Sequence, residues 1–566
     1  MKPEELGVYY ESILDKDARK EGGVYYTPQY IVDYIVENTV GEFLKNRTPE
    51  EVAKIRIVDP ACGAGVFLVG AYQYLLDWHE KHIGKLTLAK RRRILSDSIF
   101  GVDIDPLAVE ITKYCLAMQC TEGKDLSLEL DKNICVGNSL VETKFHWQKS
   151  FPYIFKQGGF DIVIGNPPYG GALLSRERKY LSSHFNVGTT DTAASFLLQA
   201  RKLAHSDGKV GFIVPKALTY APNWQKVREV VLPDITNIVD CGKVWNDVKL
   251  EMSICVLQQN NNKKTFVHAK RNTENVIETF GTQCRSLCTE FGLILNGLTK
   301  QEIEIGLKIK RNSKTLNDFV ENQRGAMLQR DVSNKGNLSV LGGKQISRYY
   351  LEKEKVKGKI FTKYVTDKRA WVYNNSVLVQ NIVAHIARPS PHILITVCPS
   401  SELENLENFI LLDTINQLTM KGQYESKFVS ALLNSFLLSW YVYRFVFAHA
   451  IRTMHFDRTT TAKIPVPDID CFTREDKTKH NKIVRLVDSI LELKRKERDV
   501  REMRNRDVFR RQIKTINHEI DMLIYQLYGL TDNEIAIIEG VSQEHEAGKP
   551  LRKRNLSQCA PPLQKK

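Results

Sequence analysis

Short apolar segments alternate with amphipathic stretches between about residues 55 and 259 of the chain. Brief apolar runs bounded by turn residues are typical of buried strands, whereas apolar positions three or four residues apart are typical of helices. Regular alternation of the two predicts a doubly wound α/β sheet. Strands are expected at 55–60, 99–105, 160–168, 210–215, 237–242 and 252–258, with helices at 67–79, 106–118 and 193–205 among them.

The remainder of the chain has a different pattern. The polar tract 259–264 predicts a surface loop or a domain boundary, and residues 265–470 show no clean period. Two apolar helical faces flank a highly charged stretch at 494–511, which predicts two helices or one long hairpin. We therefore expect an N-terminal arm (1–20), an α/β domain (21–262), a mixed domain (263–472), a helical segment (473–540) and a disordered basic tail (541–566).

Composition adds a basic surface to this picture. Lys and Arg total 81 against 66 Asp and Glu, a net charge of +15, which favours a polyanionic partner and most often a nucleic acid. No signal peptide is evident, and the most apolar stretch, 431–447, is interrupted by Asn434 and Arg444, so it predicts a buried helix and no membrane association. The 11 cysteines form no CxxC pair, which suits a reducing cytoplasm.

The strongest local signal is the tetrapeptide Asn166, Pro167, Pro168 and Tyr169, which follows the apolar segment 160–165. Ligands of doubly wound sheets bind at the carboxyl ends of strands. The prolines fix the backbone and remove two N–H donors. An Asn oxygen and the Pro167 carbonyl could then accept both hydrogens of a planar amino group and make its nitrogen nucleophilic, while Tyr169 stacks on the ring. Taken alone, the tetrapeptide is equally compatible with a proline-rich turn and a capping Asn.

A glycine-containing turn, 59–65, follows the first expected strand and opens a helix. Its two glycines let the backbone approach a bound nucleoside closely. The chain contains no Gly-Lys-Ser/Thr, which excludes a P-loop, and lacks the complete dinucleotide fingerprint. An ordinary turn between strand and helix is the alternative, with Cys62 as a packing residue.

Two further strand ends carry polar side chains. Asp103 is the better candidate for binding ribose hydroxyls, while Asp105 is expected to cap the helix that begins at Pro106. For either aspartate, helix capping is the structural alternative. Asn138 ends another apolar segment and could hydrogen-bond an adenine edge.

In this order the motifs resemble the S-adenosylmethionine-dependent DNA adenine-N6 methyltransferases of the gamma arrangement. The likeness is greatest to the methyltransferase and specificity parts of type IIG restriction–modification enzymes and to the TaqI-type enzyme. Residues 23–28 resemble the N-terminal cofactor motif, 59–67 the glycine loop, 101–106 the ribose-binding acid, 166–169 the catalytic loop and 242–248 the base-stacking motif. Trp245 stands where Phe is common, and Asn138 where many relatives have Asp.

The resemblance implies a Rossmann-like methyltransferase sheet, then a mixed target-recognition domain and a C-terminal helical segment. Segments 341–350, 432–435 and 463–467 look like the recognition domain, and 525–535 like the usual terminal segment. The implied activity is methyl transfer from S-adenosylmethionine to N6 of a flipped adenine in double-stranded DNA, within restriction–modification or phage defence. A separate cognate restriction endonuclease or defence-system subunit is a further candidate partner.

The resemblance also assigns the site, with no metal. The catalytic residues are Asn166, Pro167, Pro168 and Tyr169, and the base-stacking residues are Tyr169 and Trp245. The cofactor-binding residues are Tyr26, Thr27, Pro28, Asp59, Ala61, Gly63, Gly65, Asp103, Ile104, Asn138, Ser139 and Asn166. Arginines expected to contact DNA phosphates or bases are Arg324, Arg330, Arg348, Arg452 and Arg458.

Several other functions are weighed against this one. RNA methyltransferases and release-factor glutamine methyltransferases share the tetrapeptide but would leave about 300 residues after Gln259 unused. A C5-cytosine enzyme is disfavoured because the chain has no Pro-Cys dipeptide. A bifunctional type IIG-like endonuclease–methyltransferase is the main rival. Only about twenty residues precede Gly23, and Asp413 with Glu425 and Lys427 fits a metal-nuclease pattern only loosely. A non-catalytic DNA-binding relative is disfavoured because every catalytic position is present.

Overall fold

The computed structural model describes residues 27–122, 128–141, 145–170, 175–246, 248, 250–352, 356–383, 395–422, 424–451, 454–468, 473–500 and 503–540. The expected N-terminal arm, Tyr26, Arg452 and the basic tail lie outside the described residues. Within them, no helix is both long and apolar enough to cross a lipid bilayer.

The first half of the chain is built on a nine-stranded sheet of order β3-β2-β1-β4-β5-β7-β6-β8-β9. Strands β3, β2, β1, β4 and β5 pair in parallel, whereas β7 is antiparallel to both β5 and β6. The strands are β1 (Ile57–Asp59), β2 (Ile99–Asp103), β3 (Ile134–Val136), β4 (Phe160–Gly165), β5 (Ala204–Pro215), β6 (Ile235–Gly242), β7 (Met252–Gln258), β8 (Thr265–Arg271) and β9 (Ile277–Cys284). Strand order reverses between β1 and β4, which makes their carboxyl ends the topological switch point.

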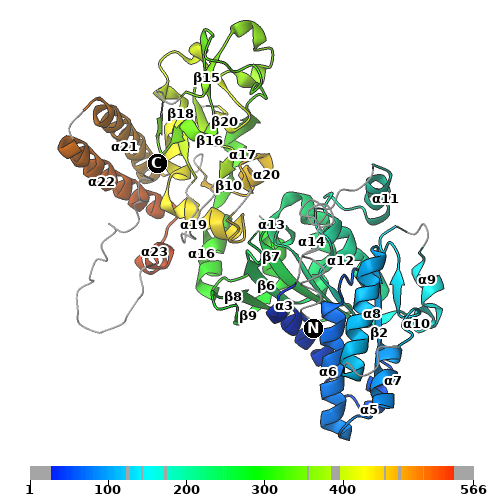
Figure 1. The fold of residues 1–566 in the computed structure, drawn as a ribbon. Helices are drawn as coiled ribbons and strands as arrows, with labels where there is room; N and C mark the ends of the chain where they lie inside the picture. Colours follow the sequence, from blue (N-terminus) through cyan, green and yellow to red (C-terminus); the bar gives the residue numbers. More distant parts are fainter. Residues whose placement is uncertain are drawn as a thin grey trace.

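Helices cover this sheet (Figure 1). α6 (Val66–Ile83) packs against α3 (Gln29–Val36), α7 (Leu88–Ser98) and α8 (Pro106–Thr121), while α12 (Thr192–Leu203) packs against β4 and β5. α8 begins as the sequence predicts. Asp105 is its N-cap and accepts a hydrogen bond from the Leu107 amide at 2.9 Å, and Pro106 occupies the first helical position.

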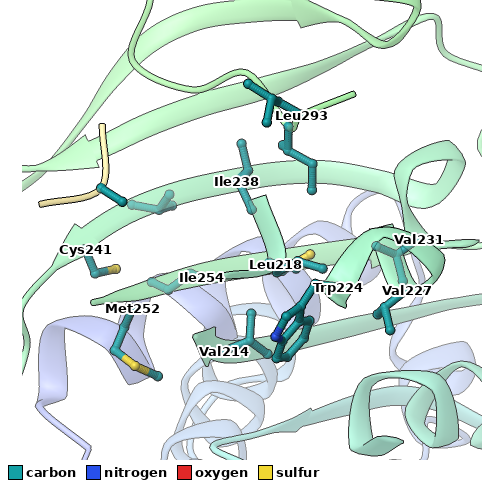
Figure 2. Close-up of a cluster of buried hydrophobic side chains, with 14 of the residues drawn as sticks. Val214, Leu218, Trp224, Val227, Val231, Ile238, Cys241, Met252, Ile254 and Leu293 are labelled. Carbon is teal, nitrogen blue, oxygen red and sulfur yellow. The ribbon is translucent and has the colours of Figure 1, made fainter. Parts of the chain in front are cut away.

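The sheet extends beyond the domain boundary expected at residues 262 and 263. After the polar tract the chain turns, with Asn260 in a left-handed conformation (φ 55°), and β8 returns parallel to β6 with Asn237 opposite Val267. β9 then completes the edge. The apolar segment that follows is also buried here. Figure 2 shows Leu293 in one buried cluster with Ile238, Leu218 and Trp224. The α/β domain therefore continues to about Leu298.

The second half is a mixed domain followed by a helical segment. A four-stranded antiparallel sheet consists of β11 (Val320–Arg324), β20 (Ile415–Met420), β16 (Ser376–Gln380) and β18 (Val397–Pro399). A three-stranded sheet contains β15 (Gly358–Ile360), β12 (Leu338–Leu341) and β19 (Phe409–Leu411). The apolar stretch 431–447 lies in two buried helices, α18 (Ser426–Leu433) and α19 (Phe436–Phe445), and in the turn after them.

The helical segment contains α21 (Arg474–Asp499), α22 (Met503–Leu527) and α23 (Asp532–Glu539). α21 and α22 pack along each other as a hairpin and stand beside the mixed domain (Figure 1). α21 also packs against α18. The predicted fold class is thus confirmed: an α/β sheet domain, then a mixed domain, then a C-terminal helical segment.

Candidate active site

The predicted site residues come together at the carboxyl ends of parallel strands. Asp59 ends β1, Asp103 ends β2, and Asn166 directly follows β4. Strand β1 pairs with both β2 and β4, so these three side chains leave neighbouring strands at the switch point. Doubly wound sheets bind their ligands in this crevice.

The loop at residues 166–170 is held at both ends. Nδ2 of Asn166 donates to Oγ1 of Thr27 at 3.2 Å, which ties the loop to the segment before α3. Beyond the prolines, Thr192 Oγ1 donates to the Pro168 carbonyl at 2.5 Å, and Asp191 accepts from the Gly170 amide. Asp191 also caps α12, so the first turn of that helix fixes the loop. With Nδ2 directed to Thr27, Oδ1 of Asn166 is the acceptor atom that remains for a ligand.

Two aromatic rings flank this loop. The ring centroids of Tyr169 and Trp245 are 5.9 Å apart and their planes are inclined by 35°. Trp245 lies after β6 in a segment that two side chains hold by its backbone. Asp240 Oδ1 accepts from the Gly242 amide at 3.0 Å, and Arg271 Nη2 donates to the Lys243 carbonyl at 2.7 Å. The rings thus form one aromatic wall beside Asn166.

The glycine turn is tight and leaves open space. Gly63 and Gly65 have φ angles of 53° and 82°, which side-chain-bearing residues seldom adopt. A Cβ on Gly65 would lie 2.9 Å from the Thr112 side chain, whereas a Cβ on Gly63 would meet nothing within 4 Å. Thr112 Oγ1 donates to the Gly63 carbonyl at 2.7 Å. A side chain at position 65 would therefore clash with Thr112, whereas the space beside Gly63 is open to a ligand.

Asp59 is almost completely buried behind this turn. Its Oδ1 accepts from the Ala61 amide at 2.9 Å, and a Cβ on Gly165 would come within 2.6 Å of the same oxygen. Glycine at the end of β4 thus makes room for the carboxylate. Burial raises the pKa of Asp59 well above its ordinary value, and the negative charge of Asp103 raises it further.

Asp103 joins two loops. Its Oδ2 accepts from the Gly63 amide at 2.8 Å and its Oδ1 from the Asp105 amide at 2.9 Å. Burial raises the pKa of Asp103 despite these hydrogen bonds. The adjacent Ile104 side chain is 68% exposed, so its apolar surface is available to cover the flat face of a base.

The residues after β3 are largely engaged within the protein. Asn138 Oδ1 accepts from the Leu140 and Val141 amides, both at 3.0 Å, so its NH₂ group is the part suited to a base edge. Ser139 is buried, its hydroxyl donates to the Pro60 carbonyl, and its own carbonyl accepts from the Trp147 indole. In this structure Ser139 therefore holds the glycine turn in place.

S-adenosylmethionine fits the donor set of this site. A buried carboxylate, Asp59, ends β1 and a half-buried one, Asp103, ends β2, and the charges that chiefly affect their pKa values are neighbouring carboxylates. This arrangement disfavours a phosphate and favours a phosphate-free nucleoside with a positive charge. The open approach at Gly63 and the exposed Ile104 supply room and an apolar face.

Some positioning residues were not predicted from the sequence. Asp191 and Thr192 could have been found, because an Asp immediately before an apolar helical pattern is an N-cap signal. Arg271 carries no such signal, because its bond to the Lys243 carbonyl joins residues 28 positions apart. Asp240 was not identified either, although its bond to the Gly242 amide spans only two residues.

The expected DNA-contacting arginines differ in exposure. Arg324, Arg330 and Arg458 are exposed, and Arg348 is half-buried. Arg324 also donates to the Asp413 carbonyl at 2.7 Å and pairs with its carboxylate at 3.0 Å, and Arg348 donates to the Asn434 carbonyl at 2.5 Å.

Comparison with known proteins finds that this chain is similar to restriction–modification enzymes. Residues 97–244 match the Eco57I restriction-modification methylase family model. The type II restriction enzyme and methyltransferase RM.Eco57I of Escherichia coli is 28% identical over 256 residues, 38% of this chain and 25% of that protein. The type II methyltransferase M.VspI of Vibrio sp. (strain 343) is 24% identical over 284 residues, 49% of this chain and 58% of that protein.

The chain thus spans between a quarter and somewhat over half the length of these two relatives. A structural match extends further. The type IIL restriction-modification enzyme MmeI, solved in complex with DNA, superposes with a TM-score of 0.62 at 12% identity, covering 95% of this chain and 81% of MmeI. The predicted resemblance is confirmed at this level: the chain is similar in sequence to Eco57I-type restriction-modification methylases over residues 97–244, and its fold is that of a restriction–modification enzyme.

Proposed function

We propose that the chain is a site-specific DNA methyltransferase that transfers a methyl group from S-adenosylmethionine to the N6 amino group of a flipped adenine in double-stranded DNA. The observation that carries this proposal is the clamped loop at the switch point. Asn166 and two prolines follow β4 there, between the cofactor-type turn and the Tyr169–Trp245 wall.

The cofactor would be held by the residues around the glycine turn. Asp103 is suited to the ribose hydroxyls, Ile104 to the adenine face, Asn138 to the adenine edge and Asp59 to the positively charged amino-acid end. Tyr26, Thr27, Pro28, Ala61, Gly63, Gly65, Ser139 and Asn166 complete the proposed cofactor-binding set. When bound, S-adenosylmethionine supplies an electrophilic methyl group on a sulfonium.

The target amino group would be held by two oxygen acceptors. Oδ1 of Asn166 and the carbonyl of Pro167 can each accept one N6 hydrogen, which draws the nitrogen lone pair out of conjugation with the ring. Tyr169 and Trp245 would stack on the extruded base and help to offset the few kcal/mol that flipping typically costs. The protein's contribution is thus mainly positioning and electrostatics, and the assignment requires no metal.

The rival classes fit the molecule less well. An RNA or protein-glutamine methyltransferase would leave the second half without a role, whereas the match to the DNA-bound MmeI extends over 95% of the chain. The nuclease pattern does not converge among the described residues. Asp413 binds Arg324 and Gln329, while Lys427 pairs with Asp488 of α21 at 2.6 Å. We therefore favour a methyltransferase acting in the cytoplasm within restriction–modification or phage defence, with a separate endonuclease or defence subunit as a candidate partner.

Replacing Asn166 tests the assignment. The variant Asn166→Ala removes one acceptor from the reacting amino group, so methylation should fall about a hundredfold or more, as when one contact to a reacting group is lost. Sequencing of DNA from an expressing host for N6-methyladenine measures the activity. Calorimetric titration with S-adenosylmethionine should show that the variant still binds the cofactor, with an affinity that falls far less than the rate of methylation.

Asn262→Ala is the matched control, because Asn262 is an exposed residue of the same domain, in the turn between β7 and β8 at the sheet edge opposite the proposed site. It should leave methylation unchanged. A folded Asn166→Ala protein with near-normal turnover would show that this loop is not catalytic. Modified cytosine without modified adenine in the host DNA would overturn the proposed target atom.

A further inference from the structure

A buried charge cluster lies at the same carboxyl edge of the sheet, beyond the end of β5, and has no role in the mechanism above. Lys216 follows β5, is 4% exposed, and places its Nζ 2.8 Å from Asp240 Oδ2 and 3.5 Å from Glu251 Oε1. Asp240 lies in β6 and Glu251 directly precedes β7. One lysine thus bridges two carboxylates where three neighbouring strands meet.

Each member of the cluster also binds the main chain. Asp240 Oδ1 accepts from the Gly242 amide at 3.0 Å, in the short segment that leads to Trp245. On the other side, Lys216 Nζ donates to the His449 carbonyl at 3.0 Å, and Glu251 Oε2 accepts from the Ile451 amide at 2.8 Å. The cluster therefore joins the base-stacking segment to residues some two hundred positions away, in the second half of the chain.

The bound turn is an integral part of the second half. Ala448 and His449 both have left-handed backbones, with φ of 46° and 60°. Shortly afterwards β21 (Met454–His455) pairs with β17 (Ile382–Val383), and the Phe456 carbonyl accepts hydrogen bonds from Asn322 and Asn416. Those two residues lie in β11 and β20 of the four-stranded sheet. The position of that sheet is thus tied, through this turn, to Lys216.

Lys216 supplies the positive charge that Asp240 and Glu251 share. Burial alone would lower the pKa of Lys216, but Asp240 and Glu251 outweigh burial and raise it, so the ammonium stays charged. Burial lowers the pKa of the His449 ring to about 3, so this ring adds no second positive charge beside Lys216. Removing the lysine would leave two buried carboxylates uncompensated, which is far more costly than removing all three charges together.

We propose that Lys216 is a positioning residue. It fixes the position of the segment that receives the flipped base relative to the part of the chain that reads the DNA sequence. Through Asp240 it fixes the segment carrying Trp245, and through His449 and Glu251 it fixes the sheet of the second half. The distance between the bases that are read and the aromatic wall that receives the flipped adenine is then constant. This inference rests on the proposed function.

The test compares four full-length proteins with the unaltered one. Lys216→Met removes the bridging cation, and Lys216→Arg keeps it. A triple variant, Lys216→Met with Asp240→Asn and Glu251→Gln, removes every charge, so that folding does not suffer from unpaired carboxylates. Arg201→Met is the matched control, because Arg201 forms a comparable pair with Asp234, at 2.5 Å, entirely within the first domain.

The readouts separate positioning from folding. The target adenine, once identified by sequencing, is replaced by 2-aminopurine, whose fluorescence rises when the base leaves the stack. For Lys216→Met and the triple variant we expect this signal and kcat to fall at least tenfold, with KM and calorimetric affinity for S-adenosylmethionine within twofold of normal. Lys216→Arg should restore at least half of both, and Arg201→Met should lower only the melting temperature.

If the triple variant folded, flipped the target adenine and methylated it at the normal rate, the inference would be overturned while the proposed function stayed intact. The inference would also be overturned if Lys216→Arg did not restore the fluorescence signal and kcat, and if Arg201→Met lowered kcat as much as Lys216→Met does. The effect would then be one of general destabilisation. An unaltered protein that does not methylate adenine would instead overturn the proposed function, and this inference with it.

Discussion

Asp103 and Asp105 stand two residues apart and have different roles. Asp103 joins the glycine turn to β2, whereas Asp105 caps α8. We expect Asp103→Ala to weaken S-adenosylmethionine binding by about 1.5–3 kcal/mol, the usual loss of a charged hydrogen-bond partner, or roughly ten- to hundredfold. Isothermal titration calorimetry measures this change.

Asp105→Ala is the control for that experiment. Loss of an N-cap should lower the free energy of unfolding by about 1 kcal/mol and leave cofactor affinity nearly unchanged. If Asp103→Ala lowered the melting temperature without changing the affinity, Asp103 would have only a structural role.

At the residue scale, a residue's role was predictable where the residues that interact lie close together in the sequence. The cap at Asp105 follows from the proline beside it, and the strand-end positions of Asp59, Asp103 and Asn166 follow from the apolar runs before them. Contacts between loops were not predictable. The bond from the Ser139 hydroxyl to Pro60 joins residues 79 positions apart, and no short pattern encodes it.

At the element scale, the sequence indicated the central strands and missed the edge of the sheet. β4 and β7 are continuous apolar runs, because both their faces are buried. β9 is largely exposed, with buried Gln283 but exposed Glu278, Thr279 and Phe280, so it lacks that signature. The polar tract before β8 therefore predicted a domain boundary where the structure has a turn within the sheet.

The contacts around Asp413 bear on whether this chain also cleaves DNA. Asp413 precedes β20 and is held by Arg324 and Gln329, whereas Lys427 of α18 points to α21. Among the described residues, no three His, Cys, Asp or Glu side chains are grouped closely enough to hold a metal ion. We expect purified protein with magnesium and S-adenosylmethionine to leave plasmid DNA intact on agarose gels.

A type IIG-like enzyme assayed in parallel verifies the cleavage conditions. Reproducible cleavage at fixed sites by this chain would restore the bifunctional alternative. The variant Asp413→Ala would then show whether this region is responsible, because abolished cleavage with retained methylation would assign a catalytic role to it.

At the scale of the whole molecule, we propose that the first domain carries out the methyl transfer and that the second half reads the DNA sequence. Sequence is read by side chains at base edges, while Lys and Arg on phosphates position the protein without specifying a sequence. A fragment ending at Leu298, where the buried segment ends, should therefore still bind S-adenosylmethionine. Its DNA binding should be weak, independent of sequence and steeply dependent on salt, as measured by fluorescence anisotropy.

A second fragment ending at residue 262 is the control for the domain boundary. It lacks β8 and β9 and leaves β6 as an unpaired edge, so it should be less stable and more prone to aggregate than the fragment ending at Leu298. Equal stability of the two fragments would favour the boundary expected from the polar tract. Methylation by the longer fragment at only the parent's sites would place specificity in the first domain, because the second half would then be dispensable for reading DNA.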